Sequence, residues 1–156
     1  MKNLLINQCQ QIEDPSLPTM SNICNILAIL FYEMEDLNWC GLYYCDENKK
    51  ECILGPFQGK VACTRIPYGK GVVGTCALKK EPIIVNNVHS FPGHIACDSA
   101  SQSEIVLPLI YNNQLLAILD IDSPKMARFE RDEAETLKVI ANQLSTLVSS
   151  DKLRMG

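Results

Sequence analysis

Two pairs of strand-like segments, each joined by a short polar turn, constrain the fold of this chain more than any other feature of its sequence. The first pair covers residues 39–45 and 51–55, and the polar run DENKK separates its members. The second pair covers residues 105–111 and 115–121, joined by the turn NNQ. Short polar connections of this kind join antiparallel neighbours. The chain is therefore expected to build an antiparallel sheet from hairpins.

Helical patterns surround these hairpins. Residues 18–36 and residues 129–150 carry apolar side chains at steps of three and four, which is typical of amphipathic helices. Between the hairpins, a glycine-rich turn from Gly69 opens a short helix that ends at the segment KKEP, residues 79–82, and short strands are expected at 64–66 and 83–85. This order is not the regular strand-helix alternation of a parallel sheet. It predicts an α+β fold, with helices on one face of the sheet and long loops over the other.

Length and charge narrow the functional classes. A chain of 156 residues fits a single domain over 1–156, in which residues 1–17 form an N-terminal extension or helix. The formal net charge is −4 and the basic residues are dispersed, so neither nucleic acid nor an anionic membrane is expected as a partner. No apolar run approaches the ~18 residues of a membrane span, and the N-terminus does not read as a secretion signal. We expect a cytoplasmic protein.

Eight cysteines in such a chain require an explanation. A secreted disulfide framework is not expected without a secretion signal, and no CxxC pair indicates structural zinc. Most of the thiols should therefore pack as small apolar side chains. Cys97 differs because it lies in a polar loop, just after a Pro-Gly turn and three residues after His94. Spacing leaves two interpretations open, a reactive thiol or a buried cysteine near a hydrogen-bonded histidine.

Carboxylates and aromatic residues form a second group of candidates. Glu104 starts one strand of the second hairpin, and Asp120 and Asp122 end the other, so antiparallel pairing brings them to one end of the sheet. Converging carboxylates would supply a general acid and a site for a ligand ammonium group, unless they are simply solvated strand ends. Trp39 and Tyr43 lie four apart on a strand and face the same side. They could cage a cation or a methyl-sulfur group, or pack in the core.

Five motifs in order make the sequence resemble a known family. They are GPFQGKVAC at 55–63, GKGVVGT at 69–75, FPGHIACD at 91–98, SEIVLP at 103–108 and LDID at 119–122. Together they resemble the free methionine-(R)-sulfoxide reductases, a family of GAF-domain enzymes, from about residue 38 to the final helix. The resemblance implies a GAF-like fold, with a central antiparallel sheet of about six strands, helices on one face and a ligand pocket under the loops of the other. It also implies a homodimer formed through helices.

The resemblance also assigns roles to the two most distinctive cysteines. Cys97 would attack the sulfoxide sulfur of free methionine-(R)-sulfoxide and become a sulfenic acid. Cys63 would then condense with the sulfenic acid to a disulfide, which thioredoxin reduces at the expense of NADPH. No bound cofactor and no metal are implied.

The remaining site residues follow from the same resemblance. The three carboxylates would bind the substrate ammonium group and the sulfoxide oxygen, and the two aromatic residues would surround the methyl-sulfur end of the substrate. These substrate-binding residues are Glu104, Asp120, Asp122, Trp39 and Tyr43.

One position departs from the family pattern. The glycine-rich motif is commonly written GVCG, whereas this chain has Val73 at the cysteine position. A relay through that thiol is impossible here, so recycling should depend on Cys63. Cys76 lies three residues further on and should point elsewhere on a helix. The alternative function is a GAF-type small-molecule sensor that binds without turnover, but mere binding would require neither Cys63 nor Cys97.

Overall fold

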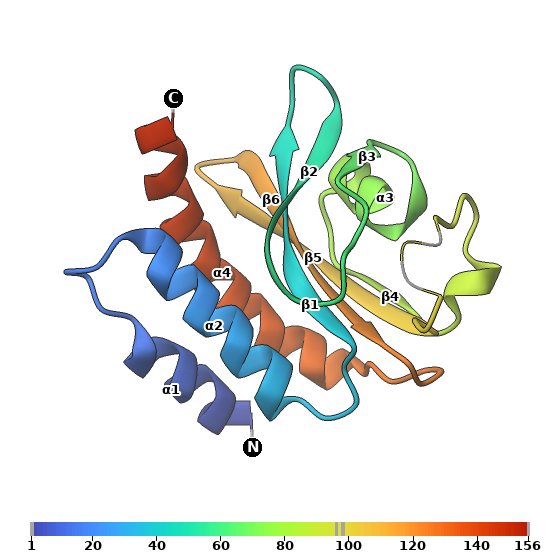
Figure 1. Ribbon diagram of the computed structural model, residues 1–156, viewed down its shortest axis with the longest axis horizontal. Helices are drawn as coiled ribbons and strands as arrows, with labels where there is room; N and C mark the ends of the chain where they lie inside the picture. Colours follow the sequence, from blue (N-terminus) through green and yellow to red (C-terminus); the bar gives the residue numbers. More distant parts are fainter. Residues whose placement is uncertain (1, 96, 98, 156) are drawn as a thin grey trace.

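A computed structural model describes residues 2–95, 97 and 99–155 of the chain. The helices are α1 (Lys2–Ile12), α2 (Thr19–Glu33), α3 (Gly71–Lys79) and α4 (Arg131–Met155), with a 3-10 turn η1 (Val88–Ser90). The strands are β1 (Trp39–Asp46), β2 (Glu51–Gly59), β3 (Arg65–Pro67), β4 (Ile83–Val85), β5 (Ser103–Tyr111) and β6 (Gln114–Ser123). They form one antiparallel six-stranded sheet in the order β3-β2-β1-β6-β5-β4 (Figure 1). The α+β prediction is confirmed.

The long helices α1, α2 and α4 lie together on one face of the sheet (Figure 1). Their apolar stripes meet strand residues in one continuous core, which includes Ile26 and Leu30 of α2, Leu137 and Leu144 of α4, and Leu119 of β6. The predicted helices at 18–36 and 129–150 correspond to α2 and α4, and the N-terminal extension contains α1. None of the described helices combines the length and the apolar character needed to cross a bilayer.

The opposite face carries a second core, and here the structure refines the prediction. Loops cover this face as expected, but the short helix α3 packs on it as well. Small residues allow that close approach, because a β carbon at Gly74 would collide with the carbonyl oxygen of Pro67. The two sheet faces are therefore covered differently, by long helices on one side and by α3 with loops on the other.

Strand β2 is longer than predicted. The sequence suggested that the strand ends at residue 55, yet it continues to Gly59, and its register with β1 shifts around Pro56. Proline lacks an N–H group and is tolerated in strands mainly at edges and irregular positions of this kind. The continuation brings Phe57 against Trp39, with 5.2 Å between the ring centroids.

The β5–β6 hairpin agrees with its predicted turn. Asn112 and Asn113 both adopt positive φ angles, of 50° and 62°. Asparagine accepts this conformation readily, and paired left-handed residues match the twist of a two-residue hairpin. The resulting register places Glu104 directly opposite Asp122, which builds one wall of the candidate site.

Candidate active site

The hairpin register brings the three predicted carboxylates together. Glu104 and Asp122 are cross-strand partners, and Asp120 lies two residues from Asp122 on the same face of β6. Each of the three offers an oxygen within 4.8 Å of the others. Glu104 is 8% exposed and Asp120 is 5% exposed. Carboxylates this close can hold a cation, either an ammonium group or a metal ion.

Burial and mutual repulsion alter the proton affinity of this cluster. Burial, reinforced by the charges of Asp120 and Asp122, raises the pKa of Glu104 well above its ordinary value. Burial also raises the pKa of Asp120 to about 6, although a hydrogen bond with Glu104 acts in the opposite direction. Within the described part of the chain, the buried Oδ1 atom of Asp120 has no hydrogen-bond partner. Glu104 is therefore the carboxyl that retains a proton most readily, and Asp120 keeps an acceptor for a ligand.

An aromatic wall stands beside the carboxylates. Trp39 and Tyr43 lie on the same face of β1, as expected, with ring centroids 5.8 Å apart, and Phe57 stacks on Trp39. Gly41 lies between them on β1, where a β carbon would collide with the side chains of Trp39 and Phe57. Because β1 pairs with β6, Trp39 lies opposite Asp122. The apolar wall and the carboxylates thus share one side of the sheet.

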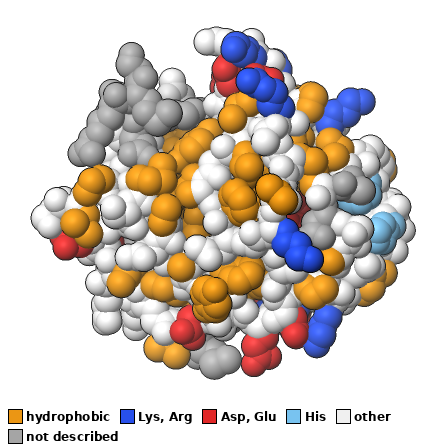
Figure 2. All heavy atoms as spheres, in the orientation of Figure 1, with side chains coloured by type: hydrophobic (Ala, Val, Ile, Leu, Met, Phe, Trp, Pro, Cys, Tyr) orange, Lys and Arg blue, Asp and Glu red, His pale blue; other side chains and the backbone are white. Residues whose placement is uncertain are grey.

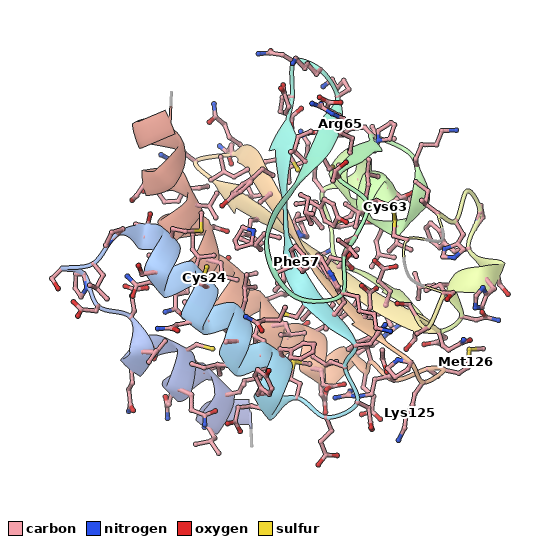
Figure 3. The ribbon with its side chains drawn as sticks, viewed as in Figure 1. Cys24, Phe57, Cys63, Arg65, Lys125 and Met126 are labelled. Atoms are coloured by element: carbon pink, nitrogen blue, oxygen red, sulfur yellow. A yellow bond between two sulfur atoms is a disulfide. The ribbon has the colours of Figure 1, made fainter. Side chains whose placement is uncertain are left out.

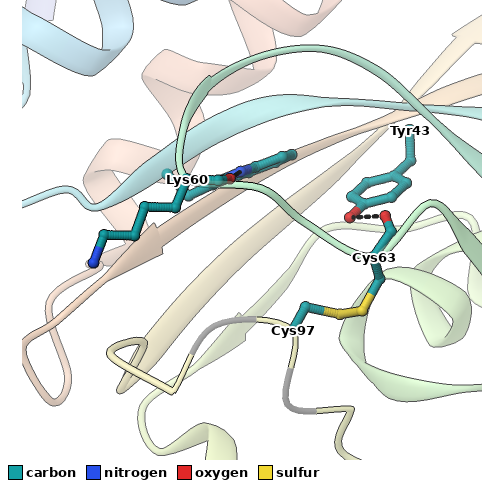
Figure 4. The surroundings of a disulfide bond; sticks show 5 residues. Tyr43, Lys60, Cys63 and Cys97 are labelled. Atoms are coloured by element: carbon teal, nitrogen blue, oxygen red, sulfur yellow. Dashed lines mark hydrogen bonds between the residues drawn. A yellow bond between two sulfur atoms is a disulfide. The ribbon is translucent and has the colours of Figure 1, made fainter.

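The polar atoms of the two aromatic side chains hold the segment that follows β2. The indole Nε1 of Trp39 donates to the carbonyl oxygen of Lys60 at 3.1 Å. The hydroxyl of Tyr43 donates to the carbonyl oxygen of Cys63 at 2.9 Å (Figure 4). Sequence reasoning missed this contribution, since the acceptors are backbone atoms of a loop. Trp39 and Tyr43 therefore position Cys63 as well as line the pocket.

Cys63 and Cys97 form a disulfide bond (Figure 4). Their Cα atoms are 5.4 Å apart, although 34 positions separate them in the sequence. Cys63 follows β2, and Cys97 lies in the loop between η1 and β5. The pairing implied by the family resemblance is thereby confirmed. Ala96 and Asp98, which belong to the quoted FPGHIACD motif, lie outside the described residues.

These groups surround one pocket of about 60 Å³. Its lining includes all but one of the predicted site residues, namely Trp39, Tyr43, Cys97, Glu104, Asp120 and Asp122. The exception is Cys63, which is bonded to Cys97 but is not itself a lining residue. Most ligand sites enclose several hundred Å³, roughly 300–1,000. The pocket is therefore small in this disulfide-bonded form of the protein.

The first turn of α3 forms a part of the pocket that the sequence analysis did not identify. Gly71, Val72 and Val73 line the pocket, and Lys70 lies at its edge. The first N–H groups of a helix have no acceptor within the helix, and the helix dipole makes this end positive. Such a turn binds carboxylates and other anions. The sequence signal was the GKGVVGT motif, which we interpreted as a helix start and as part of the family pattern, without a role in binding a ligand.

His94 also lines the pocket, three residues before Cys97. Burial and the neighbouring His89 lower the pKa of His94, and the two rings are 5.6 Å apart. His94 is therefore expected to be neutral at pH 7. A neutral imidazole supplies hydrogen bonds but no positive charge to a nearby thiolate.

Val73 and Cys76 of α3 differ in whether they line the pocket. Val73 lines the pocket, so its side chain fills the place where the family motif commonly has a third thiol. Cys76 is fully buried, its thiol donates to the carbonyl oxygen of Glu81 at 3.4 Å, and burial raises its pKa. Cys76 is not among the pocket residues of the described chain, as expected. The reason is its burial and not its spacing, because residues three apart on a helix share a face.

Comparison with known proteins gives a consistent assignment. The GAF domain profile matches residues 19–148. The free methionine-R-sulfoxide reductase of Escherichia coli (strain K12) is 42% identical over 131 residues, which cover 84% of this chain and 78% of that protein. Protein YtsP of Bacillus subtilis (strain 168) is 40% identical over 141 residues, which cover 90% and 86% of the two chains.

Solved structures agree with these relatives. The X-ray structure of free methionine-R-sulfoxide reductase from Neisseria meningitidis in complex with its substrate superposes with a TM-score of 0.87 at 35% identity. That match covers 98% of this chain and 93% of the other.

The fold and the pocket together define a GAF domain in which one cysteine of a disulfide-bonded pair lines the ligand cavity. Within this class, the similarity over most of the relatives' length decides the family. The chain belongs to the free methionine-(R)-sulfoxide reductase family of GAF-domain proteins.

Proposed function

We propose that this chain reduces free L-methionine-(R)-sulfoxide to methionine, with Cys97 as the nucleophile. One observation carries the proposal: Cys97, which lines the pocket, is joined to Cys63 in a disulfide. This is the oxidised end state that a two-thiol reduction leaves behind. A GAF-type sensor that binds without turnover would require neither thiol.

The pocket offers a place for each part of the substrate. Asp120 and Asp122 accept the ammonium group, since Asp120 keeps an unpartnered acceptor oxygen in the described structure. The first turn of α3 receives the substrate carboxylate. Trp39 and Tyr43 contact the methyl-sulfur end, and Glu104 donates a hydrogen bond to the sulfoxide oxygen. Recognition of both backbone charges would restrict the enzyme to the free amino acid.

The reaction follows from these positions. The thiolate of Cys97 attacks the sulfoxide sulfur while Glu104 protonates its oxygen. The oxygen passes to the cysteine sulfur as the thioether methionine leaves, so that Cys97 becomes a sulfenic acid. The thiol of Cys63 then attacks the sulfenic acid, water departs and the observed disulfide forms. With valine at position 73, Cys63 is the one resolving thiol that the site offers.

An external dithiol must return the disulfide to two thiols. We assign this role to thioredoxin, kept reduced by NADPH, and the protein itself holds no bound cofactor in this scheme. The cytoplasm suits such a cycle, because the other six cysteines carry no disulfide in the described structure.

Three cysteine variants test the proposal. Thioredoxin-coupled NADPH oxidation should require free methionine-(R)-sulfoxide and should be abolished in Cys97→Ser. Cys63→Ser should release about one methionine per protein and leave a sulfenic acid that dimedone traps. Cys24→Ser is the matched control, because Cys24 is exposed on α2, and its turnover should equal that of the wild type.

The outcomes separate the two candidate functions. Unchanged turnover in Cys97→Ser would show that Cys97 is not the nucleophile. If the reduced wild type bound methionine-(R)-sulfoxide tightly but formed no methionine, the result would contradict the enzymatic function and support the sensor function.

A further inference from the structure

The segment between β2 and β3 presents an exposed apolar side chain beside the disulfide. Val61 is 88% exposed, more than any other described large hydrophobic residue, and it lies two positions before Cys63. A single exposed apolar residue is common on protein surfaces. The position of Val61 next to a disulfide that must be reduced is what distinguishes it.

Val61 is held firmly in this exposed place. Trp39 binds the carbonyl oxygen of Lys60 on one side of it, and Tyr43 binds the carbonyl oxygen of Cys63 on the other. Both anchors are buried side chains of β1. A surface that is already ordered loses little conformational freedom when a partner binds. The fixed backbone therefore presents Val61 as a preformed contact.

The surroundings of Val61 are basic. Lys60, Arg65 and Lys70 are exposed. Lys60 and Arg65 lie three and two positions from Cys63 in the sequence, and the Lys60 side chain extends away from the disulfide into solvent (Figure 4). In the space-filling view basic side chains, with some acidic ones among them, lie over the half of the molecule that carries β2, β3 and α3 (Figure 2). Arg65 pairs with Glu51 at 2.7 Å, whereas Lys60 and Lys70 form no ion pair with the rest of the described chain. The whole chain has a net charge of −4. The positive charges of Lys60 and Lys70, which no carboxylate of the described chain pairs, favour a partner with acidic side chains.

We propose that Val61, Lys60 and Lys70 form the docking surface for the protein dithiol that reduces Cys63–Cys97, and that this partner presents an acidic rim around its reactive thiol. The inference rests on the proposed reductase cycle and adds the place where the reductant binds. Val61 fills an apolar depression on the partner, and the two lysines contact its carboxylates.

The docked partner completes a balanced exchange. Its thiolate attacks the sulfur of Cys63, forms a mixed disulfide and displaces Cys97 as a thiolate. Its second thiol then attacks the mixed disulfide, Cys63 leaves as a thiol, and the partner becomes the disulfide. Two electrons pass to the enzyme, and Cys97 is again a nucleophile.

The test compares a protein reductant with a small one. The full chain is oxidised with diamide and then mixed either with reduced thioredoxin or with dithiothreitol, without any sulfoxide. Acid quenching and alkylation, followed by mass spectrometry of the Cys63 and Cys97 peptides, give the rate of reduction. In the Val61→Asp/Lys60→Glu double variant, reduction by thioredoxin should slow by about tenfold or more, while reduction by dithiothreitol changes less than about twofold.

Matched substitutions elsewhere on the surface provide the control. Met126 is 52% exposed in the β6–α4 connection, apart from Cys63 (Figure 3), and Lys138 lies on α4. Met126→Asp/Lys138→Glu should be reduced by thioredoxin at the wild-type rate. An unchanged thioredoxin rate in Val61→Asp/Lys60→Glu would overturn the docking surface, and so would equal slowing with both reductants. Because this assay uses no sulfoxide, its result does not depend on whether the chain reduces methionine-(R)-sulfoxide.

Discussion

At the scale of single residues, Glu104 is a buried carboxyl whose ionisation is unfavourable in the folded protein. Burial beside Asp120 and Asp122 raises its pKa above the ordinary value of 4.5. Between that value and the raised one, the folded state binds more protons than the unfolded state. The free energy of unfolding therefore falls as pH rises through this window. A residue that weakens the fold at neutral pH is typical of a functional position.

Glu104→Gln tests this interpretation. Glutamine keeps the shape but cannot ionise, so the variant should be more stable than the wild type at pH 8, by about 1.4 kcal/mol for each unit of pKa elevation. The difference should vanish near pH 4, where both side chains are neutral. Turnover should fall by roughly 10²-fold, since the proton donor is lost. Denaturant titrations between pH 4 and pH 8, together with kcat, check both expectations.

The comparison separates the carboxylate cluster from titrating groups elsewhere in the chain; within the cluster, the pKa of Asp120 responds to the same substitution because Asp120 and Glu104 share a hydrogen bond. His94 has a lowered pKa and shifts stability in the opposite direction with pH, but it is present in both proteins. Parallel stability curves for the wild type and Glu104→Gln would contradict the raised pKa.

Some site residues were accessible from sequence and others were not, for identifiable reasons. Glu104, Asp120 and Asp122 could be grouped because a hairpin fixes which strand ends meet. The Cys63–Cys97 pair spans 34 positions and two loops, so no local rule predicts it, and only the family resemblance did. The hydrogen bonds from Trp39 and Tyr43 end on loop carbonyls, which no side-chain pattern reveals.

At the scale of elements, α3 has a role that goes beyond packing. Its first turn lines the same pocket as the carboxylates, so we expect the free amino acid to contact both a positive helix end and a negative cluster. This arrangement predicts that the substrate carboxylate contributes to binding. A hydrogen bond to a charged group contributes about 1.5–3 kcal/mol, roughly a 10- to 100-fold effect.

L-methioninamide-(R)-sulfoxide provides the corresponding test, because it lacks the negative charge but keeps the sulfoxide. Its kcat/KM should be about 10- to 100-fold below that of free methionine-(R)-sulfoxide. Val72→Pro removes one N–H group from the first turn of α3, where proline is tolerated. The preference for the acid over the amide should shrink in this variant. An undiminished preference would place the substrate carboxylate elsewhere.

The elements themselves show which structural features sequence patterns predict. Local signals fixed both hairpins and the two long helices, because turn residues such as Asn112 and apolar periodicity act over short distances. The extension of β2 past Pro56 depends on its pairing with β1 and on stacking of Phe57 on Trp39. The face on which α3 packs depends on contacts with β3 and β5. Both are tertiary effects that override local preference.

At the scale of the whole molecule, the sheet separates two surfaces with different functions. Helix α3 lies on one face of the sheet, and the three long helices lie on the other (Figure 1). The pocket and the disulfide belong to the face that carries α3. We infer that residues 1–156 work as one unit, in which α1 is an extension that packs on α2 and α4. The helical surface retains exposed large apolar residues on each of its helices, namely Leu4, Ile12, Met20, Tyr32 and Val139.

Exposed apolar side chains on three neighbouring helices favour self-association. We predict a homodimer in solution through this helical face, and Tyr32, at 76% exposure, is the largest side chain available to it. Tyr32→Glu combined with Leu4→Glu should shift the mass measured by light scattering from dimer to monomer. Turnover driven by dithiothreitol should persist, because every pocket residue described above comes from one chain and lies on the opposite face of the sheet from the helices.

Met126→Glu is the control, because Met126 is exposed away from the helices, and this variant should remain dimeric. A monomeric wild type would exclude the helical interface, and a folded monomeric variant without turnover would show that the site depends on the second copy.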